Sequence, residues 1–300
     1  MSNFLTRMGE SSRIRAERAE RQRPAELLAQ RVRRLPPPPA LRLSPQGFDL
    51  IAELKRRSPS EGTLASTALK ISAQARDYAR SGAAALSVLT EPDEFAGSLA
   101  HLKEAAAAAA NAVGDLPVPT MRKDFLVSPY QLLEARAAGA SGVLLIAAML
   151  NDRELPAMVL ATHQLGMFAL VEVFDRADLQ RATAVVRAAG PAVVEGRCRT
   201  LLGVNCRDLR TLAVDFGRFA ALAPGMSGAV VDGIANDIPM VAESGVETPG
   251  QAARVAGLGY RLALVGTALM RSSDPGRLGT ELLAAGRASA FEARGFSKPA

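Results

Sequence analysis

Residues 118–146 have the sequence VPTMRKDFLVSPYQLLEARAAGASGVLLI, which contains one complete strand–helix–strand unit. It opens with the apolar run Val118–Met121. Ser128-Pro129 is a typical helix start, because serine caps the first turn and proline is tolerated there. The amphipathic stretch 128–139 then leads to a second apolar run, Gly142–Ile146. This order predicts two parallel strands joined by a helix.

The same unit repeats along the chain. Each apolar run is too short for a buried helix and nearly continuous in hydrophobicity, as parallel strands covered on both faces are. The expected strands are Asp49–Leu54, Ala85–Leu89, Val118–Met121, Gly142–Ile146, Ala169–Val173, Leu201–Asn205, Met240–Glu243 and Leu262–Val265. The expected helices are 66–81, 98–112, 128–139, 151–165, 175–189, 215–223, 248–257 and 275–287. Eight of each in alternation predict an α/β fold, the (β/α)8 TIM barrel.

A doubly wound open sheet is the alternative architecture. Such a sheet normally carries a glycine-rich dinucleotide turn after its first strand, and Ser58-Pro59-Ser60-Glu61-Gly62 lacks that pattern. The sequence therefore favours the barrel, and it predicts no dinucleotide cofactor.

The net charge of +6 comes from the N-terminal segment alone. Residues 1–42 hold ten Arg and four Glu, so the rest of the chain is electrically balanced. We expect a solvated helix over 10–34 that ends at the proline run 36–39, a stiff spacer. The expected organisation is a basic helical extension (1–45), a catalytic barrel (46–290) and a tail (291–300).

Composition excludes several classes of protein. Two Cys and two His are too few for a disulfide scaffold or a His-rich metal centre, so we expect no metal. No apolar run is long enough to span a membrane, and no secretory signal opens the chain, so we expect a cytoplasmic protein. Because the charge excess lies outside the barrel, we expect no nucleic-acid partner, with RNA tethering by 1–42 as the alternative. The oligomeric state stays open, with a monomer as the simplest expectation.

Polar residues follow most of the expected strands, at the end where barrel chemistry gathers. The chain has five Lys against 31 Arg, and two of the five, Lys55 and Lys123, lie at strand ends. A desolvated lysine can release a proton near neutral pH, whereas arginine cannot, so this pattern suggests proton transfer. Glu53, Glu172 and Glu243 would shift one another's pKa around the same mouth. A structural ring of salt bridges is the alternative interpretation.

Two glycine-containing loops predict a phosphate site. Gly245 follows the seventh strand, and Gly266-Thr267 follows the eighth. In barrels these two loops, with a short helix such as 268–271, commonly hold a phosphate through backbone N–H groups. We therefore expect a small phosphorylated substrate.

The strand-end stretches resemble the motifs of the indole-3-glycerol phosphate synthase family, in chain order. They are Ile51-Ala52-Glu53-Leu54-Lys55-Arg56-Arg57-Ser58-Pro59-Ser60-Glu61-Gly62, Ser87-Val88-Leu89-Thr90-Glu91 with Phe95 and Gly97-Ser98, Arg122-Lys123-Asp124-Phe125 followed by Pro129-Tyr130-Gln131 and Glu134-Ala135-Arg136, Leu170-Val171-Glu172-Val173, Gly203-Val204-Asn205-Cys206-Arg207-Asp208-Leu209, Ala242-Glu243-Ser244-Gly245-Val246 and Val265-Gly266-Thr267-Ala268-Leu269-Met270. The resemblance covers residues 48 to about 285. It implies a cofactor-free carbon–carbon lyase of tryptophan biosynthesis that forms an indole by ring closure, decarboxylation and dehydration. It also implies an N-terminal helix over the barrel mouth.

The resemblance further implies a role for each matching residue. Lys123 matches the general acid, and Lys55 the lysine that pairs with the substrate carboxylate or phosphate. Glu172 matches the glutamate that acts as base or stabilises positive charge. The remaining matches are Glu53 and Asn205 at the sugar hydroxyls, Arg207 and Glu243 in the charged network, Ser58, Ser244, Gly245, Gly266 and Thr267 around the phosphate, and Phe95 and Phe125 in the aromatic pocket.

Two other functions are open to test. Phosphoribosylanthranilate isomerase is a neighbouring barrel with a Cys base and an Asp acid, whereas the first strand here ends with Glu53 and Lys55. A catalytically silent phosphate-binding barrel would bind ligand without forming indole. The presence of Lys123 and Glu172 together with that pair argues against it.

Overall fold

The computed structural model describes residues 4–59, 62–64, 70–114, 116–208, 213–223 and 238–293. Its strands form the closed parallel barrel that the sequence predicts, in the order β1-β12-β11-β10-β7-β6-β5-β4. Strand β1 pairs with both β12 and β4, which closes the ring. The barrel strands are β1 (Asp49–Leu54), β4 (Ala85–Leu89), β5 (Thr120–Lys123), β6 (Gly142–Ile146), β7 (Phe168–Val173), β10 (Thr200–Asn205), β11 (Met240–Glu243) and β12 (Leu262–Val265).

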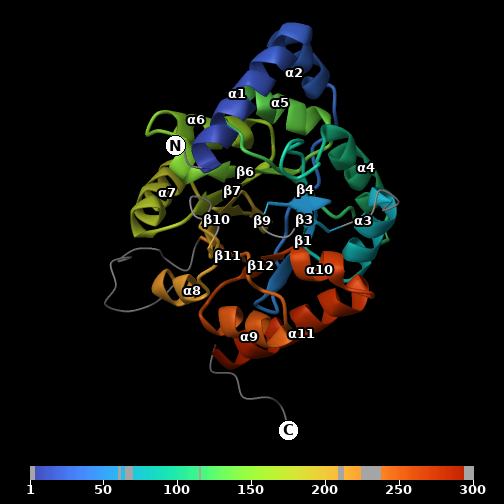
Figure 1. The fold of residues 1–300 in the computed structure, drawn as a ribbon, viewed down its shortest axis with the longest axis vertical. Coiled ribbons are helices and arrows are strands. Elements are labelled where there is room, and N and C mark those ends of the chain that lie inside the picture. Colours follow the sequence, from blue (N-terminus) through green and yellow to red (C-terminus); the bar gives the residue numbers. More distant parts are fainter. Residues whose placement is uncertain are drawn as a thin grey trace.

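Helices surround the strands (Figure 1). They are α3 (Ile71–Arg80), α4 (Leu99–Ala109), α5 (Pro129–Ala137), α6 (Glu154–Gln164), α7 (Arg176–Ala188), α8 (Gly217–Ala221), α9 (Pro249–Gly257), α10 (Thr267–Arg271) and α11 (Pro275–Ala293), with a 3-10 turn, η1 (Ala147–Met149), after β6. Ser128 and Thr248 cap α5 and α9 in capping boxes, each with proline at the helix start, as the sequence predicts. The helices expected over 66–81 and 215–223 are shorter, and residues 65–69 lie outside the described part of the chain.

Strand alternation decides which side chains face the barrel interior. Successive side chains in a strand point to opposite faces. Ile51, Met121, Leu170 and Val241 belong to the apolar cluster inside the barrel, while their strand neighbours pack outward against the helices. The residues two positions further along these strands therefore also face inward, one layer nearer the mouth. Those residues are Glu53, Lys123, Glu172 and Glu243.

The third barrel strand differs from its expected position. The apolar run predicts a strand at Val118–Met121, whereas β5 covers Thr120–Lys123. Pro119 has no N–H to donate to a strand ladder, so regular pairing begins after it. Lys123 is therefore the last strand residue rather than the start of a loop, and its backbone is held by pairing with Leu89.

The expectation of one solvated N-terminal helix over 10–34 is wrong. The segment forms two helices, α1 (Phe4–Gln22) and α2 (Ala25–Arg33), with Pro24 between them. Both helices bury an apolar stripe that the many arginines obscure in the composition, and in Figure 1 they lie at the top of the view, beside α5. The buried residues are Phe4, Leu5, Met8, Ser12 and Ala16 of α1, and Leu28 and Val32 of α2.

The segment after α2 lies at the end of the barrel where the strands begin. The carbonyl of Pro36 accepts a hydrogen bond from Arg136 of α5. Leu41 is buried in the cluster inside the barrel and pairs with Cys198 in an isolated bridge. Cys198 belongs to one of two short hairpins that the sequence analysis did not predict; these are β2–β3 (Arg57–Ser58 and Gly62–Thr63) and β8–β9 (Val193–Val194 and Arg197–Cys198).

Candidate active site

A cavity lies at the carboxyl ends of the barrel strands, the end at which barrel chemistry gathers. All the candidate site residues selected from the sequence line it, although they come from seven separate parts of the chain. They are Glu53, Lys55, Ser58, Phe95, Lys123, Phe125, Glu172, Asn205, Arg207, Glu243, Ser244, Gly245, Gly266 and Thr267.

Lys123 lies at the centre of the polar network. Its Nζ is 3.4 Å from Oε2 of Glu172 on β7 and 3.4 Å from Oε2 of Glu243 on β11. Burial alone would lower the pKa of this ammonium, but the negative charges of Glu172, Glu243 and Glu53 outweigh it and raise the pKa above the ordinary value of 10.5. The expectation that desolvation lets this lysine release its proton near neutral pH is therefore wrong: the group stays protonated there and can donate a hydrogen bond or a proton.

The same network shifts the pKa of the Glu243 carboxyl group. Burial raises its pKa well above the ordinary value of 4.5, and the nearby carboxylate of Glu172 raises it further. Oε1 of Glu243 and Oε1 of Glu172 are both buried, and neither has a hydrogen-bond partner within the described part of the chain. Buried oxygens of this kind are costly unless something pairs with them, so both can accept hydrogen bonds from a ligand in the cavity.

Glu53 and Lys55 form a second pair at the end of β1. Nζ of Lys55 is 3.0 Å from Oε1 of Glu53, and both side chains are largely buried. The negative charge of Glu53 also raises the pKa of Lys123. The two lysine-containing clusters therefore interact electrostatically across the mouth. The three carboxylates and two lysines thus converge on one cavity.

Asn205 and Arg207 follow one another at the end of β10. The backbone N–H of Arg207 donates to Oδ1 of Asn205 at 2.9 Å, which fixes the orientation of the amide. The carbonyl of Asn205 accepts from the guanidinium of Arg218 at 2.9 Å. The loop after β10 therefore presents a fixed amide at the cavity wall, next to Glu243 in the strand register.

The two loops predicted to hold phosphate lie side by side at the mouth, because β11 and β12 are neighbours. Ser244 and Gly245 both have left-handed backbone, with φ of 67° and 69°. Consecutive residues of this kind turn the chain sharply after β11. A Cβ at position 245 would lie 2.8 Å from Sγ of Cys206. Gly266 precedes the short helix α10, which begins at Thr267, so backbone N–H groups of the first turn lie at this loop.

An aromatic wall closes another side of the cavity. The rings of Phe95 and Phe125 are 6.2 Å apart, and that of Phe125 lies 5.9 Å from the ring of Phe4. Phe4 belongs to α1 and lies outside the helix expected from the sequence, which begins at residue 10. The signal was present: Phe4, Leu5 and Met8 have the spacing of an apolar helix face.

Cys206 and the two histidines take no part in the cavity. Burial raises the pKa of the Cys206 thiol to about 12, so it is a poor nucleophile. His163 Nε2 lies 3.0 Å from Oγ1 of Thr200, and His101 lies on α4. In the described ranges no group of three His, Cys, Asp or Glu side chains is placed to hold a metal ion. None of the described helices has the length and hydropathy to cross a membrane.

Comparison with known proteins identifies close relatives. A family model described as indole-3-glycerol phosphate synthase matches residues 7–282. The indole-3-glycerol phosphate synthase of Parafrankia sp. is 42% identical over 278 residues, covering 91% of this chain and 93% of that protein. The enzyme of the same name from Micrococcus luteus is 44% identical, covering 84% and 82%. Among solved structures, thiamine phosphate pyrophosphorylase from Pyrococcus furiosus has a TM-score of 0.52 at 15% identity, covering 81% and 97%, which shows the barrel fold alone.

Proposed function

The chain belongs to the indole-3-glycerol phosphate synthase family, and on this premise we propose how its barrel mouth performs the reaction. The enzyme is a carbon–carbon lyase of tryptophan biosynthesis. It converts 1-(2-carboxyphenylamino)-1-deoxyribulose 5-phosphate to indole-3-glycerol phosphate. The observation that carries the residue assignment is Lys123, held 3.4 Å from both Glu172 and Glu243 over the cavity.

Ring closure is assigned to Lys123 and the aromatic wall. The ring carbon that bears the carboxylate attacks the sugar ketone, and the Lys123 ammonium gives a proton to the ketone oxygen as the new bond forms. The bond to the carboxylate then breaks, its electron pair restores the aromatic ring, and CO2 leaves. Phe95 and Phe125 lie where they would keep water from that carboxylate, which favours the neutral product.

Dehydration is assigned to the acidic groups and Lys55. The anilino nitrogen supplies the electron pair that expels the new hydroxyl as water, and loss of a ring proton then completes the indole. Glu172 stabilises the positive nitrogen or accepts that proton, and Lys55 assists the departure of water. Glu53 and Asn205 hold the sugar hydroxyls. These groups line one cavity, so each step belongs to the network rather than to one residue.

The phosphate is assigned to the loops after β11 and β12. Ser244, Gly245, Gly266 and Thr267 line the same part of the cavity, and Ser58 lines it from the loop after β1. Backbone N–H groups at the start of a helix favour an anion. Binding the phosphate there sets the sugar between the lysines and the carboxylates.

An assay for product formation tests this proposal. The purified protein should convert the carboxyphenylamino deoxyribulose phosphate to a product with indole fluorescence. Lys123→Ala should lower kcat by about 10²–10⁴-fold while substrate still binds. Lys103→Ala, which removes an exposed lysine of α4, is the matched control and should behave as wild type. Full turnover by Lys123→Ala would refute the assignment, and ligand binding without turnover by wild type would indicate a silent barrel.

The division of the chain into an extension, a barrel and a tail is also part of the proposal. We propose that residues 1–45 form an extension that serves the barrel (46–290), with 291–300 as a tail, in a cytoplasmic enzyme without a nucleic-acid partner. The burial of one face of α1 at the mouth supports a role of the extension in the site rather than as an RNA tether. Salt-dependent RNA binding lost on deletion of 1–42 would contradict this.

A further inference from the structure

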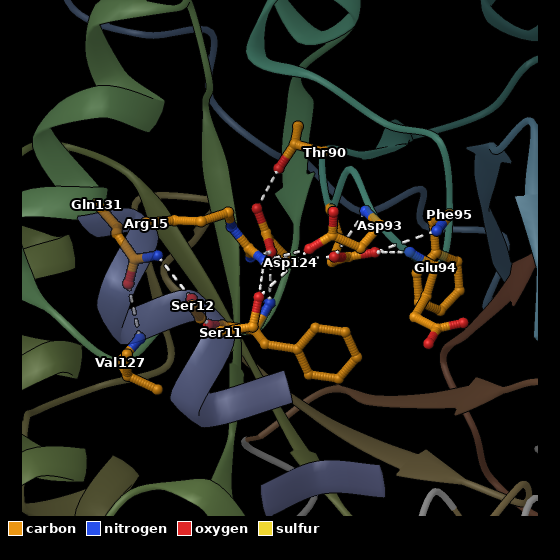
Figure 2. Close-up of polar contacts among 12 residues, drawn as sticks. Ser11, Ser12, Arg15, Thr90, Asp93, Glu94, Phe95, Asp124, Val127 and Gln131 are labelled. Carbon is orange, nitrogen blue, oxygen red and sulfur yellow. Dashed lines mark hydrogen bonds and ion pairs between the residues drawn. The ribbon is translucent and has the colours of Figure 1, made fainter. Parts of the chain in front are cut away.

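Arg15 connects α1 to two strands of the barrel mouth. Its guanidinium lies 3.0 Å from Oδ1 of Asp124, which follows β5 (Figure 2), and 3.3 Å from Oε1 of Glu91, which follows β4. Both carboxylates are buried, with 1% and 0% of their side chains exposed, whereas a quarter of the Arg15 side chain is exposed. Neither Arg15 nor Glu91 lines the cavity. Any effect of Arg15 on the reaction must therefore pass through its partners.

Glu91 determines the shape of the loop that carries Phe95. Its carboxylate accepts hydrogen bonds from the backbone N–H groups of Asp93, Glu94 and Phe95, at 3.0, 2.7 and 3.1 Å. Its own carbonyl accepts from Gly97 at 2.8 Å. The loop is thus folded around one buried carboxylate, and Phe95 lies inside this turn.

Asp124 holds the neighbouring aromatic residue in the same way. Its Oδ1 accepts from the backbone N–H of Phe125 at 2.9 Å, and its Oδ2 accepts from Thr90 at 2.7 Å. Burial would raise the pKa of Asp124, but the positive charges of Arg122 and Arg15 outweigh it and lower the pKa below its ordinary value. The group is therefore ionised, and its bond to Arg15 is charge-assisted.

Ser12 also holds α1 against the barrel, through Phe125 and Gln131. Its hydroxyl donates to the carbonyl of Phe125 and accepts from Nε2 of Gln131 at 2.8 Å. Three turns before Arg15 along the same helix, the ring of Phe4 packs on that of Phe125. The three phenylalanines of the cavity wall are thus held by Arg15 through Glu91, through Asp124 and through α1 itself.

We propose that Arg15 is a positioning residue for the aromatic end of the substrate. It sets the relative placement of Phe4, Phe95 and Phe125 without touching substrate, so it determines substrate affinity rather than proton transfer. The proposal rests on the assignment of this wall to the aromatic ring under the proposed function. Misplacement of binding groups by about 1 Å costs up to about 100-fold in enzymes, so the effect should be measurable.

Steady-state kinetics of Arg15→Ala test the inference. We expect KM to rise about tenfold or more with kcat changed by less than about twofold, because a group that acts on binding alone changes KM. Arg15→Lys should be intermediate, since one ammonium cannot bond both carboxylates as the forked guanidinium does. Arg18→Ala, which removes an exposed arginine of the same helix, is the control and should leave both parameters unchanged.

A double-mutant cycle separates positioning from a merely structural tether. If Arg15 acts through placement of Phe4, each single variant, Arg15→Ala and Phe4→Ala, raises KM by some factor. The double variant should then raise KM by clearly less than the product of these two factors. A KM equal to wild type in Arg15→Ala, a fall in kcat alone, or separate effects that multiply would each overturn the inference.

A binding measurement keeps this test apart from the proposed function. Anthranilate, which carries only the aromatic end, is fluorescent and can be titrated without turnover. Arg15→Ala should weaken its binding and leave that of inorganic phosphate unchanged; equal anthranilate affinity in Arg15→Ala and Arg18→Ala would overturn the inference. Wild-type protein that binds anthranilate but forms no indole product would contradict the proposed function alone.

Discussion

The carboxylate of Glu243 lies directly against the backbone of Gly203 on the neighbouring strand. A Cβ at position 203 would overlap Oε1 of Glu243 and come within 3.0 Å of Cδ1 of Leu170. Glycine is thus the residue that lets the Glu243 side chain extend across the barrel toward Lys123. Glycine within a strand is conformationally unfavourable, but here it leaves room for the carboxylate of Glu243.

Gly203→Ala should therefore reduce activity through Glu243. The added methyl group displaces the carboxylate from the Lys123 ammonium, and we expect kcat to fall roughly 10- to 100-fold. Gly250→Ala is the matched control, because a Cβ there meets nothing within 4 Å, and it should behave as wild type. Wild-type kcat for Gly203→Ala would show that the position of Glu243 is not important to the reaction.

Glu243→Gln should stabilise the protein at neutral pH. The folded-state pKa of Glu243 is raised, so folding is favoured when the group is protonated and loses that contribution as the pH rises from about 4.5 through the raised pKa. Glutamine removes this penalty and keeps the shape. Thermal unfolding should show a midpoint higher by a few degrees near pH 7, with the difference shrinking toward pH 4.5. A lower midpoint at pH 7 would contradict the burial argument.

The alkaline limb of the pH–rate profile should report on Lys123. Three carboxylates raise its pKa, so wild-type kcat should not decline through loss of this proton up to about pH 9. In Glu243→Gln one of those charges is absent, and any alkaline decline should move to lower pH. An alkaline limb that moves to higher pH in this variant would contradict the assignment of Lys123 as the proton donor.

Gly266→Ala should weaken phosphate binding. A Cβ at this position would overlap Oε1 of Glu53, so the loop after β12 must move or the Glu53–Lys55 pair must shift. We expect KM to rise about tenfold, since the loop backbone would no longer lie where the anion binds. Competitive inhibition by inorganic phosphate should weaken in parallel. Unchanged inhibition would place the phosphate elsewhere.

The barrel itself could be predicted from the sequence because its evidence is local. The continuous apolar runs, the Ser128-Pro129 and Thr248-Pro249 helix starts and the alternation of the two patterns each depend on neighbouring residues only. The structure confirms the eight strands with shifts at their ends, of which that at Pro119 is the clearest. The strand-end rule then selected the two lysines and three glutamates that line one cavity, although it also selected Glu91 and Arg122, which do not line it.

The role of the N-terminal segment could not be predicted in the same way. Its arginines outnumber the apolar residues and suggest a solvated helix, but one stripe that includes Phe4 and Ser12 is buried. Whether such a narrow stripe is buried depends on a complementary surface elsewhere in the fold. That surface is formed by Phe125 and Gln131, more than a hundred residues away.

The sequence by itself determined the fold, the family and the layer of inward-facing groups, because strand period and motif order are properties of the chain. Only the tertiary structure decided which charges meet. It placed Glu243 beside Lys123 through the space at Gly203, and it paired Arg15 with Glu91 and Asp124. Ion pairs depend on distances of a few ångströms between distant segments, and those distances exist only once the barrel has closed.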